Sequence, residues 1–177
     1  MEISQISDSS SALMMKIKDL YVASFPECER RPWQSVGELT AAGSPYFSMN
    51  VIRDDEGVFA GFISLWKLPD ALYVEHFAID RERRGSGIGS KVIAEIVNRA
   101  GNVPVVLEVE LPDDSPEAPR RIEFYQRNGF MAMDQFPYYQ PPYTPELESV
   151  PMMLMTSSPL PDPERFVIML HTLVYNQ

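Results

Sequence analysis

The chain has 177 residues, with 25 acidic side chains against 15 basic ones and a formal net charge of −10. Hydrophobic residues make up 45% of it and aromatic residues 11%, enough to fill the core of one domain and too many for a disordered tail. An acidic surface repels a phosphate backbone, so nucleic acid is not an expected partner. One cysteine and two histidines are too few for the usual zinc sites, so no metal is expected.

The beginning of the sequence shows no sign of a targeting segment. Residues 1–11 are mostly polar and partly acidic, and they lack the basic start and apolar run of a secretory signal. No apolar stretch approaches the ~20 residues that a membrane-spanning helix needs. A cytoplasmic protein without a membrane partner is therefore expected.

Two helices are predicted in the first 45 residues. Apolar side chains recur at helical spacing over residues 13–24, and Pro26 ends this pattern. Ser35, followed three residues later by Glu38, fits a capping box at the start of a second short helix. Gly43 is expected to close that helix.

Three antiparallel strands are predicted next. Residues 47–53 and 58–66 flank an Asp-Asp-Glu-Gly turn and predict a hairpin, and residues 72–79 form a third, mostly apolar run. Strict alternation along this third strand would place Glu75 and His76 on opposite faces, and we interpret His76 as structural.

The second half begins with alternating helices and strands. Residues 88–100 carry an apolar stripe at helical spacing. Residues 103–111 form a strand with apolar side chains on one face and Glu108 and Glu110 on the other. A further helix is predicted within residues 115–129. Strand, helix, strand and helix in this order imply a parallel strand pair and a mixed α/β fold.

The last third is rich in proline. Residues 136–151 are dense in Pro and Tyr, which excludes a helix and favours a loop packed on the domain over the wall of a substrate pocket. Final strands are predicted at 130–136 and 151–156. Residues 161–177 are interpreted as a short helix plus a tail of unassigned role. No long linker divides the chain, so one domain is expected over residues 1–177.

A glycine-rich turn at residues 80–91 joins the third strand to the following helix. Glycines at a helix start let backbone N–H groups approach an anion, and four basic side chains add positive charge. The turn therefore predicts a phosphate or pyrophosphate ligand, with a plain solvated turn as the alternative. The dinucleotide fingerprint fails because position 90 is Ser, and the P-loop fails because the order is Ser90-Lys91.

Two motifs together resemble the GCN5-related N-acetyltransferases, the GNAT family. The acetyl-CoA motif of that family is Arg or Gln, two residues, Gly, one residue, then Gly or Ala, and Arg84, Gly87 and Gly89 match it. Residues 124–130, Phe-Tyr-Gln-Arg-Asn-Gly-Phe, resemble the family's later signature. The resemblance is strongest over residues 72–130.

This resemblance implies a mixed, mostly antiparallel twisted sheet with helices on both faces and a splayed central strand pair. It implies that the backbone of Phe77, Ala78 and Ile79 pairs with the pantetheine arm of acetyl-CoA. The backbone N–H groups that would hold the pyrophosphate are those of Arg84, Gly85, Ser86, Gly87, Ile88, Gly89 and Ser90.

The implied activity is transfer of the acetyl group of acetyl-CoA to a primary amine by direct attack on the thioester. The acceptor would be a small-molecule or peptide amine, which the sequence does not identify. The alternative is a non-catalytic acyl-CoA-binding sensor or interaction domain of the same fold. The oligomeric state stays open, with a homodimer as one option.

Two proton-transfer roles are assigned to side chains. By analogy with the family, Tyr125 gives a proton to the leaving thiolate, against the alternative that it only packs in the core. A lysine-like amine has a pKa of ~10.4 and must lose a proton before it attacks. Glu75, expected on the same face as Phe77 and beside the cofactor arm, is the first candidate for the base, and Glu108 and Glu110 are its rivals.

The acceptor site is expected between two loop regions. Residues 25–33 and the aromatic residues 138–143 would form its walls. Residues 108–117 contain five acids and no base, which would attract a cationic amine. A solvated acidic rim without a ligand is the favoured alternative for that run.

Overall fold

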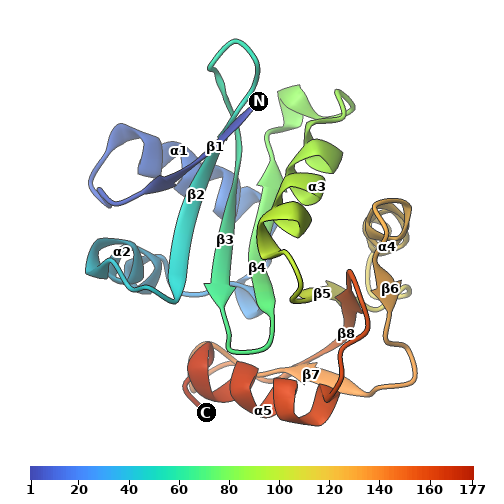
Figure 1. Ribbon diagram of the computed structural model, residues 1–177. Coiled ribbons are helices and arrows are strands. Elements are labelled where there is room, and N and C mark those ends of the chain that lie inside the picture. Colours follow the sequence, from blue (N-terminus) through green and yellow to red (C-terminus); the bar gives the residue numbers. More distant parts are fainter.

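The computed structural model describes residues 1–177 and contains one eight-stranded sheet with helices on both faces (Figure 1). The strand order is β1-β2-β3-β4-β5-β8-β6, and β7 pairs with β8 outside this path. The elements are β1 (Glu2–Ile6), α1 (Ala12–Ser24), η1 (Glu27–Glu29), α2 (Trp33–Ala42), β2 (Phe47–Arg53), β3 (Phe59–Lys67), β4 (Leu72–Ile79), η2 (Arg81–Arg83), α3 (Ile88–Ala100), β5 (Val105–Glu110), α4 (Ala118–Arg127), β6 (Met131–Ala132), β7 (Tyr138–Gln140), β8 (Val150–Thr156) and α5 (Pro163–Leu173). This arrangement confirms the expected fold class.

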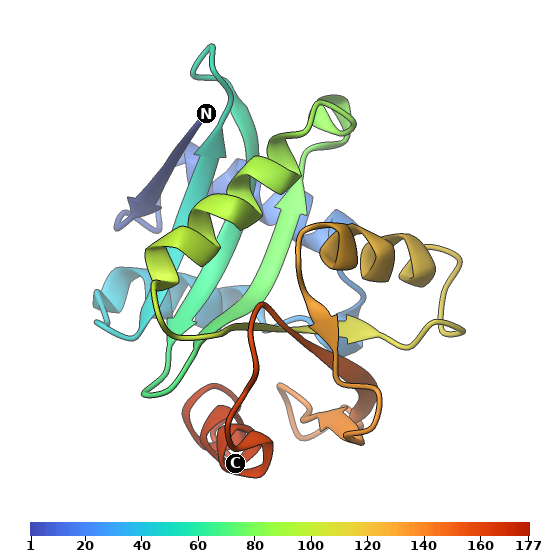
Figure 2. The same cartoon turned by 45° about the vertical axis from the view of Figure 1, so that its right-hand side comes forward.

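The two faces of the sheet are covered by two separate apolar clusters. Side chains of α1, α2 and α5 pack in one cluster, which includes Ile17 and Phe166. Side chains of α3 and α4 pack in the other, which includes Ile96 and Ile122. Figure 2 shows α3 crossing over the strands on one side, with α1 and α2 behind them. Burial of these apolar stripes holds the three layers together.

The central strands β4 and β5 separate after a short parallel contact. They pair only between Leu72–Val74 and Val105–Leu107. Beyond these residues β5 runs away from β4 (Figure 2) and continues its pairing with β8. The backbone of β4 from Glu75 to Ile79 therefore has no partner strand on this side. The expected splay of the central pair is confirmed.

A β-bulge in β4 changes the direction of two side chains. Two adjacent residues of β3 pair with Val74 and His76, so Glu75 is an extra residue without an opposite partner. Glu75 and His76 consequently both contact residues on the α1 face, whereas Phe77 packs with the α3 cluster. The prediction of strict alternation was wrong here, because hydrophobic patterning does not reveal an inserted residue.

Two local predictions near the beginning of the chain also differ from the structure. The second helix begins at Trp33 instead of at a capping box, because the N–H of Val36 bonds to the carbonyl of Pro32 at 3.2 Å. The cap residue is therefore Pro32, three residues before the predicted cap Ser35. Strand β1 was not predicted, since five residues with two buried isoleucines give too weak a pattern.

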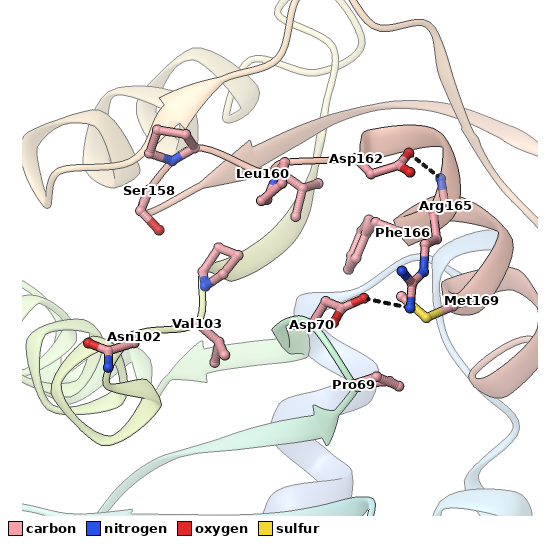
Figure 3. A pocket seen from close by; sticks show the side chains of 13 residues that line it. Pro69, Asp70, Asn102, Val103, Ser158, Leu160, Asp162, Arg165, Phe166 and Met169 are labelled. Atoms are coloured by element: carbon pink, nitrogen blue, oxygen red, sulfur yellow. Dashed lines mark hydrogen bonds and ion pairs between the residues drawn. The ribbon is translucent and has the colours of Figure 1, made fainter.

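The proline-rich part of the chain is ordered around β8. Strand β7 forms a short edge strand against β8, and α5 begins at the cap residue Asp162, whose side chain accepts from the N–H of Arg165 at 3.0 Å. A cavity of about 390 Å³ lies where α5 meets the β3–β4 turn, and Arg165 pairs with Asp70 across it at 3.2 Å (Figure 3). This cavity lies at the beginning of β4, whereas the glycine-rich turn follows its end. None of the helices is long and apolar enough to cross a membrane.

Candidate active site

The glycine-rich turn presents a row of backbone donors. Gly85 and Gly87 have φ of 78° and 79°, a conformation that glycine adopts without strain. None of the N–H groups from Gly85 to Ser90 donates to another group of the protein, and most of these residues are exposed. The positive end of the α3 dipole adds to the donors. The turn is thus built to bind an anion with several oxygens, such as a pyrophosphate.

The basic side chains of the turn are only partly available for that anion. Arg83 pairs with Asp54 of the β2–β3 hairpin at 3.0 Å, so its charge is neutralised. Lys91 and Asp55 lie 3.9 Å apart on the surface. Arg84 donates through Nε to the carbonyl of Ile79 at 2.9 Å, which fixes its side chain beside the end of β4.

The two sequence motifs meet in space at Gly89. A Cβ on this residue would lie 3.3 Å from the ring of Phe124. Because glycine has no side chain, the first turn of α3 packs closely against Phe124 of α4. Ile79 completes this contact. The glycine motif and the aromatic signature are therefore parts of one packed unit.

Tyr125 follows Phe124 on the inner side of α4. Its ring packs against Phe124 and Phe130, with centroids 5.1 and 5.7 Å away. Its hydroxyl makes no hydrogen bond within the protein. Burial raises the pKa of Tyr125, against the opposing charge of Arg121, so this hydroxyl keeps its proton at neutral pH and is free to donate it.

Glu75 is held on all sides by donors. Its Oε1 accepts from Nε and Nη2 of Arg31 at 3.0 and 2.8 Å, and from the hydroxyl of Tyr143 at 3.2 Å. Its Oε2 accepts from Nε1 of Trp66 at 2.9 Å. Burial alone would raise the pKa of Glu75, but the charge of Arg31 and the hydrogen bond from Trp66 outweigh it and hold that pKa well below its usual range.

Arg31 is itself almost enclosed. Its guanidinium lies 4.8 Å from the ring centre of Tyr143 and 5.5 Å from that of Trp66, and it donates to the carbonyl of Val174 at 2.7 Å. Its side chain is 8% exposed and that of Glu75 is 2% exposed, so neither charge has water as an alternative partner. The pair links β4 to the segment that follows α5.

Glu108 lies on β5, across the splay from Glu75. Its two carboxylate oxygens accept hydrogen bonds from the hydroxyls of Tyr138 and Tyr175. Burial raises the pKa of Glu108 to about 7, although the tyrosine hydroxyls act in the opposite direction, and the charge of Glu75 raises it further.

Two further acids lie near the end of β5. Glu110 pairs with Arg121 and with the hydroxyl of Ser115. Burial and the charge of Glu110 raise the pKa of Glu29, in η1, to about 7. The acidic run was expected to be a solvated rim, yet Glu110 has a side chain only 12% exposed. Glu29 was missed because its sequence neighbourhood mixes both charges.

The two loop regions expected around an acceptor do come together. The side-chain amide of Gln140, at the end of β7, lies 3.4 Å from the carbonyl of Cys28 in η1. Residues 25–33 and 138–143 thus lie side by side on the α1 face, where Glu75 also points.

Comparison with known proteins identifies the family. Residues 14–130 match the model of the acetyltransferase (GNAT) family, which is well over half of the chain. The chain belongs to the GNAT acetyltransferase family. This match confirms the family resemblance that the two motifs showed. The protein is an acyltransferase that transfers acetyl groups.

Three relatives show how far the similarity of this GNAT protein extends. A structure from Bacteroides thetaiotaomicron, assigned to the GNAT family, is 35% identical and covers 100% of this chain and 99% of its own, with a TM-score of 0.89. YjbC of Bacillus subtilis, assigned as an acetyltransferase, is 32% identical over 87 residues, which are 46% of this chain and 41% of that protein. An aminoglycoside 6'-N-acetyltransferase in complex with coenzyme A is 18% identical over 92% of this chain and 100% of its own, with a TM-score of 0.60, and shares the fold.

Proposed function

We propose that this GNAT protein, as one domain over residues 1–177, transfers the acetyl group of acetyl-CoA to a primary amine of a small molecule or peptide. The observation that carries the proposal is the placement of the anion-binding turn at the end of β4, directly after the stretch from Glu75 to Ile79 that has no partner strand. A long thioester cofactor needs both: donors for its pyrophosphate and an open strand edge for its arm.

The residues of this chain that would hold acetyl-CoA follow from that placement. The backbone of Phe77, Ala78 and Ile79 would pair with the pantetheine arm, and the N–H groups from Gly85 to Ser90 would bind the pyrophosphate. The N–H of Arg84, which was expected in this set, bonds instead to the carbonyl of Arg81 at 3.4 Å. Acetyl-CoA supplies the acetyl group as an activated thioester. The coenzyme A bound to the aminoglycoside relative of the same fold supports this assignment.

For the proton acceptor, the contacts favour Glu108 over Glu75. The low pKa of Glu75, caused by Arg31, makes its carboxylate a weak base, whereas the pKa of Glu108 of about 7 matches a base that works near neutral pH. Glu108 would take the amine proton directly or through water. Tyr125, whose hydroxyl has no partner in the protein, would give its proton to the departing thiolate.

The acids around the acceptor region favour a cationic amine. Glu29, Glu108 and Glu110 lie in this region, and two of the arginines there are paired with acids, Arg31 with Glu75 and Arg121 with Glu110. Such a surface attracts ammonium groups and repels carboxylates. An aminoglycoside, the acceptor class in the name of one relative, is one suitable test compound.

The activity is tested by measuring thiol release from acetyl-CoA with a panel of polyamines, aminoglycosides, amino acids and lysine peptides. Release that depends on one class of amine supports the proposal. Tight binding of coenzyme A without release for any amine would instead support the non-catalytic sensor.

Tyr125→Phe should lower kcat by about 10- to 100-fold, because loss of a positioned acid removes a proton donor of this order of effect. Affinity for coenzyme A, measured by calorimetry, should stay within about twofold. Tyr46→Phe is the matched control, since Tyr46 is 63% exposed and lies outside the site. Unchanged kcat in Tyr125→Phe would contradict the acid role.

Gly87→Ala should weaken coenzyme A binding by about tenfold or more. Alanine at φ 79° is strained by about 1–3 kcal/mol, and relief of this strain turns the N–H groups away from the anion. Gly57→Ala is the matched control, because Gly57 has φ 78°, equally open surroundings and a position in the β2–β3 hairpin. Both variants should lose similar stability, and only Gly87→Ala should lose affinity. Equal affinities would show that the turn does not hold the cofactor.

A further inference from the structure

We propose that Tyr175 is a positioning residue for proton transfer, whose hydroxyl fixes the carboxylate of Glu108 and orders the tyrosine hydroxyls that connect β4 to β5. The inference rests on the proposed role of Glu108 as the proton acceptor. Tyr175 lies after α5, in the segment to which sequence reasoning assigned no role.

A continuous chain of hydrogen bonds crosses the splay through Tyr175. Its hydroxyl donates to Oε2 of Glu108 at 2.9 Å and lies 3.1 Å from the hydroxyl of Tyr73 and 3.4 Å from that of Tyr143. Tyr143 in turn donates to Glu75 at 3.2 Å. Hydrogen bonds therefore connect Tyr73 on β4 through Tyr175 to Glu108 on β5, whereas Tyr143, which lies beside Tyr175, gives its proton to Glu75.

The single proton on each tyrosine hydroxyl determines which group is the donor in each hydrogen bond. A tyrosine hydroxyl has a single proton, and that of Tyr175 goes to the Glu108 carboxylate. In the contact between Tyr73 and Tyr175, Tyr73 must then be the donor. The order Tyr73 to Tyr175 to Glu108 polarises each bond along the chain and strengthens the last one. When Glu108 takes a proton, the order can reverse without any movement of heavy atoms.

Hydrogen bonds to the backbone on both sides of Tyr175 hold its hydroxyl in position. The carbonyl of Val174 accepts from Arg31 at 2.7 Å, and the N–H of Gln177 bonds to the carbonyl of His171 at 3.0 Å. The ring of Tyr175 packs against Tyr143, with centroids 4.9 Å apart. The segment after α5 is thus tied to the same ion pair that fixes Glu75.

Titratable groups from every neighbouring element act on Glu108. The tyrosines around it are Tyr73 on β4, Tyr138 on β7, Tyr143 after β7 and Tyr175 after α5, and all four have a pKa raised by burial, so they act as donors. Glu75 adds a negative charge, which Arg31 balances. His171 on α5 packs beside Tyr138 and has a pKa lowered by burial, so it brings no positive charge at neutral pH.

The test is the pH profile of kcat/KM for Tyr175→Phe. Donation by Tyr175 favours the charged carboxylate, so its loss should move the acidic limb of the profile upward by roughly half to one pH unit. Activity at pH 6 should fall about 3- to 10-fold, with partial recovery at pH 8.5 and KM for acetyl-CoA unchanged. A residue with a purely structural role would lower activity equally at every pH.

Controls separate this inference from the proposed function. Tyr46→Phe, at a residue that is 63% exposed and lies outside the site, should leave the limb in place. Tyr73→Phe removes the donor to Tyr175 but keeps the bond between Tyr175 and Glu108, so it should shift the limb less, and it serves as the test if Tyr175→Phe does not fold. If the parent enzyme is active and the acidic limb stays in place in both variants, the inference about Tyr175 is overturned while the proposed function still stands. An inactive parent enzyme overturns the proposed function.

Discussion

Replacing Arg31 with Met should lower the free energy of unfolding by about 3–5 kcal/mol at pH 7, because it leaves the buried carboxylate of Glu75 without its counter-charge. Methionine keeps most of the side-chain volume between Trp66 and Tyr143, so the loss reflects charge more than packing. The carbonyl of Val174 also loses its donor, which loosens the segment that carries Tyr175. Chemical denaturation monitored by tryptophan fluorescence measures the change.

The pH dependence of this loss has a definite sign. In the parent protein the folded-state pKa of Glu75 lies below its unfolded value of ~4.3, so its stabilising contribution is present above that value and is lost as the pH falls. Without Arg31, burial raises the folded-state pKa above the unfolded value. Stability of the Arg31→Met variant should therefore decrease as the pH rises from about 5 to 8, whereas the ion pair in the parent stays intact over this range.

Two comparisons make the result specific to the ion pair. Arg30→Met removes a guanidinium that bonds only to the carbonyls of Val22 and Phe25, and should cost no more than about 1–1.5 kcal/mol. The double variant Arg31→Met/Glu75→Gln should regain a large part of the loss, since no buried charge remains. An Arg31→Met loss equal to that of Arg30→Met would show that the pair contributes no special stability.

The parts of the fold that the sequence predicted are those encoded locally. The glycine turn, the stripe of α3 and the aromatic signature of α4 each lie within a short window, where backbone freedom and helical spacing leave a readable pattern. The pairing of the β2–β3 hairpin is likewise set by its own turn. The family could be identified because residues 72–130 contain all of these local signals.

The polar network at the site could not be predicted, because its members meet only in the folded chain. Arg31 and Glu75 are 44 residues apart, and Tyr175 is 67 residues from Glu108. The bulge at Glu75 reverses the face predicted for His76. The sequence also offered no reason to expect that Asp54, in a distant hairpin, would neutralise one of the basic side chains of the glycine turn.

Glu108→Gln should lower kcat/KM by about 100- to 1,000-fold at pH 7.5, because a positioned base contributes a rate factor of this order. The parent should show kcat/KM rising with pH through about 7, as Glu108 loses its proton, and the variant should lack that limb. Glu56→Gln, in the exposed β2–β3 turn, is the control and should keep both the rate and the limb. A parent-like profile in Glu108→Gln would assign the base to another residue.

The same substitution has a thermodynamic signature that needs no substrate. The folded-state pKa of Glu108, about 7, lies above the unfolded value of ~4.3, so the folded protein holds a proton that the unfolded chain has released. The stability that this proton contributes is complete below ~4.3 and is lost as the pH rises through 7, by roughly 4 kcal/mol in total. Glu108→Gln cannot titrate, so its stability relative to the parent should increase by that amount between pH 4 and pH 8. A constant difference across this range would mean that Glu108 is already ionised at pH 5, and a base with so low a pKa could not produce the activity limb near neutrality.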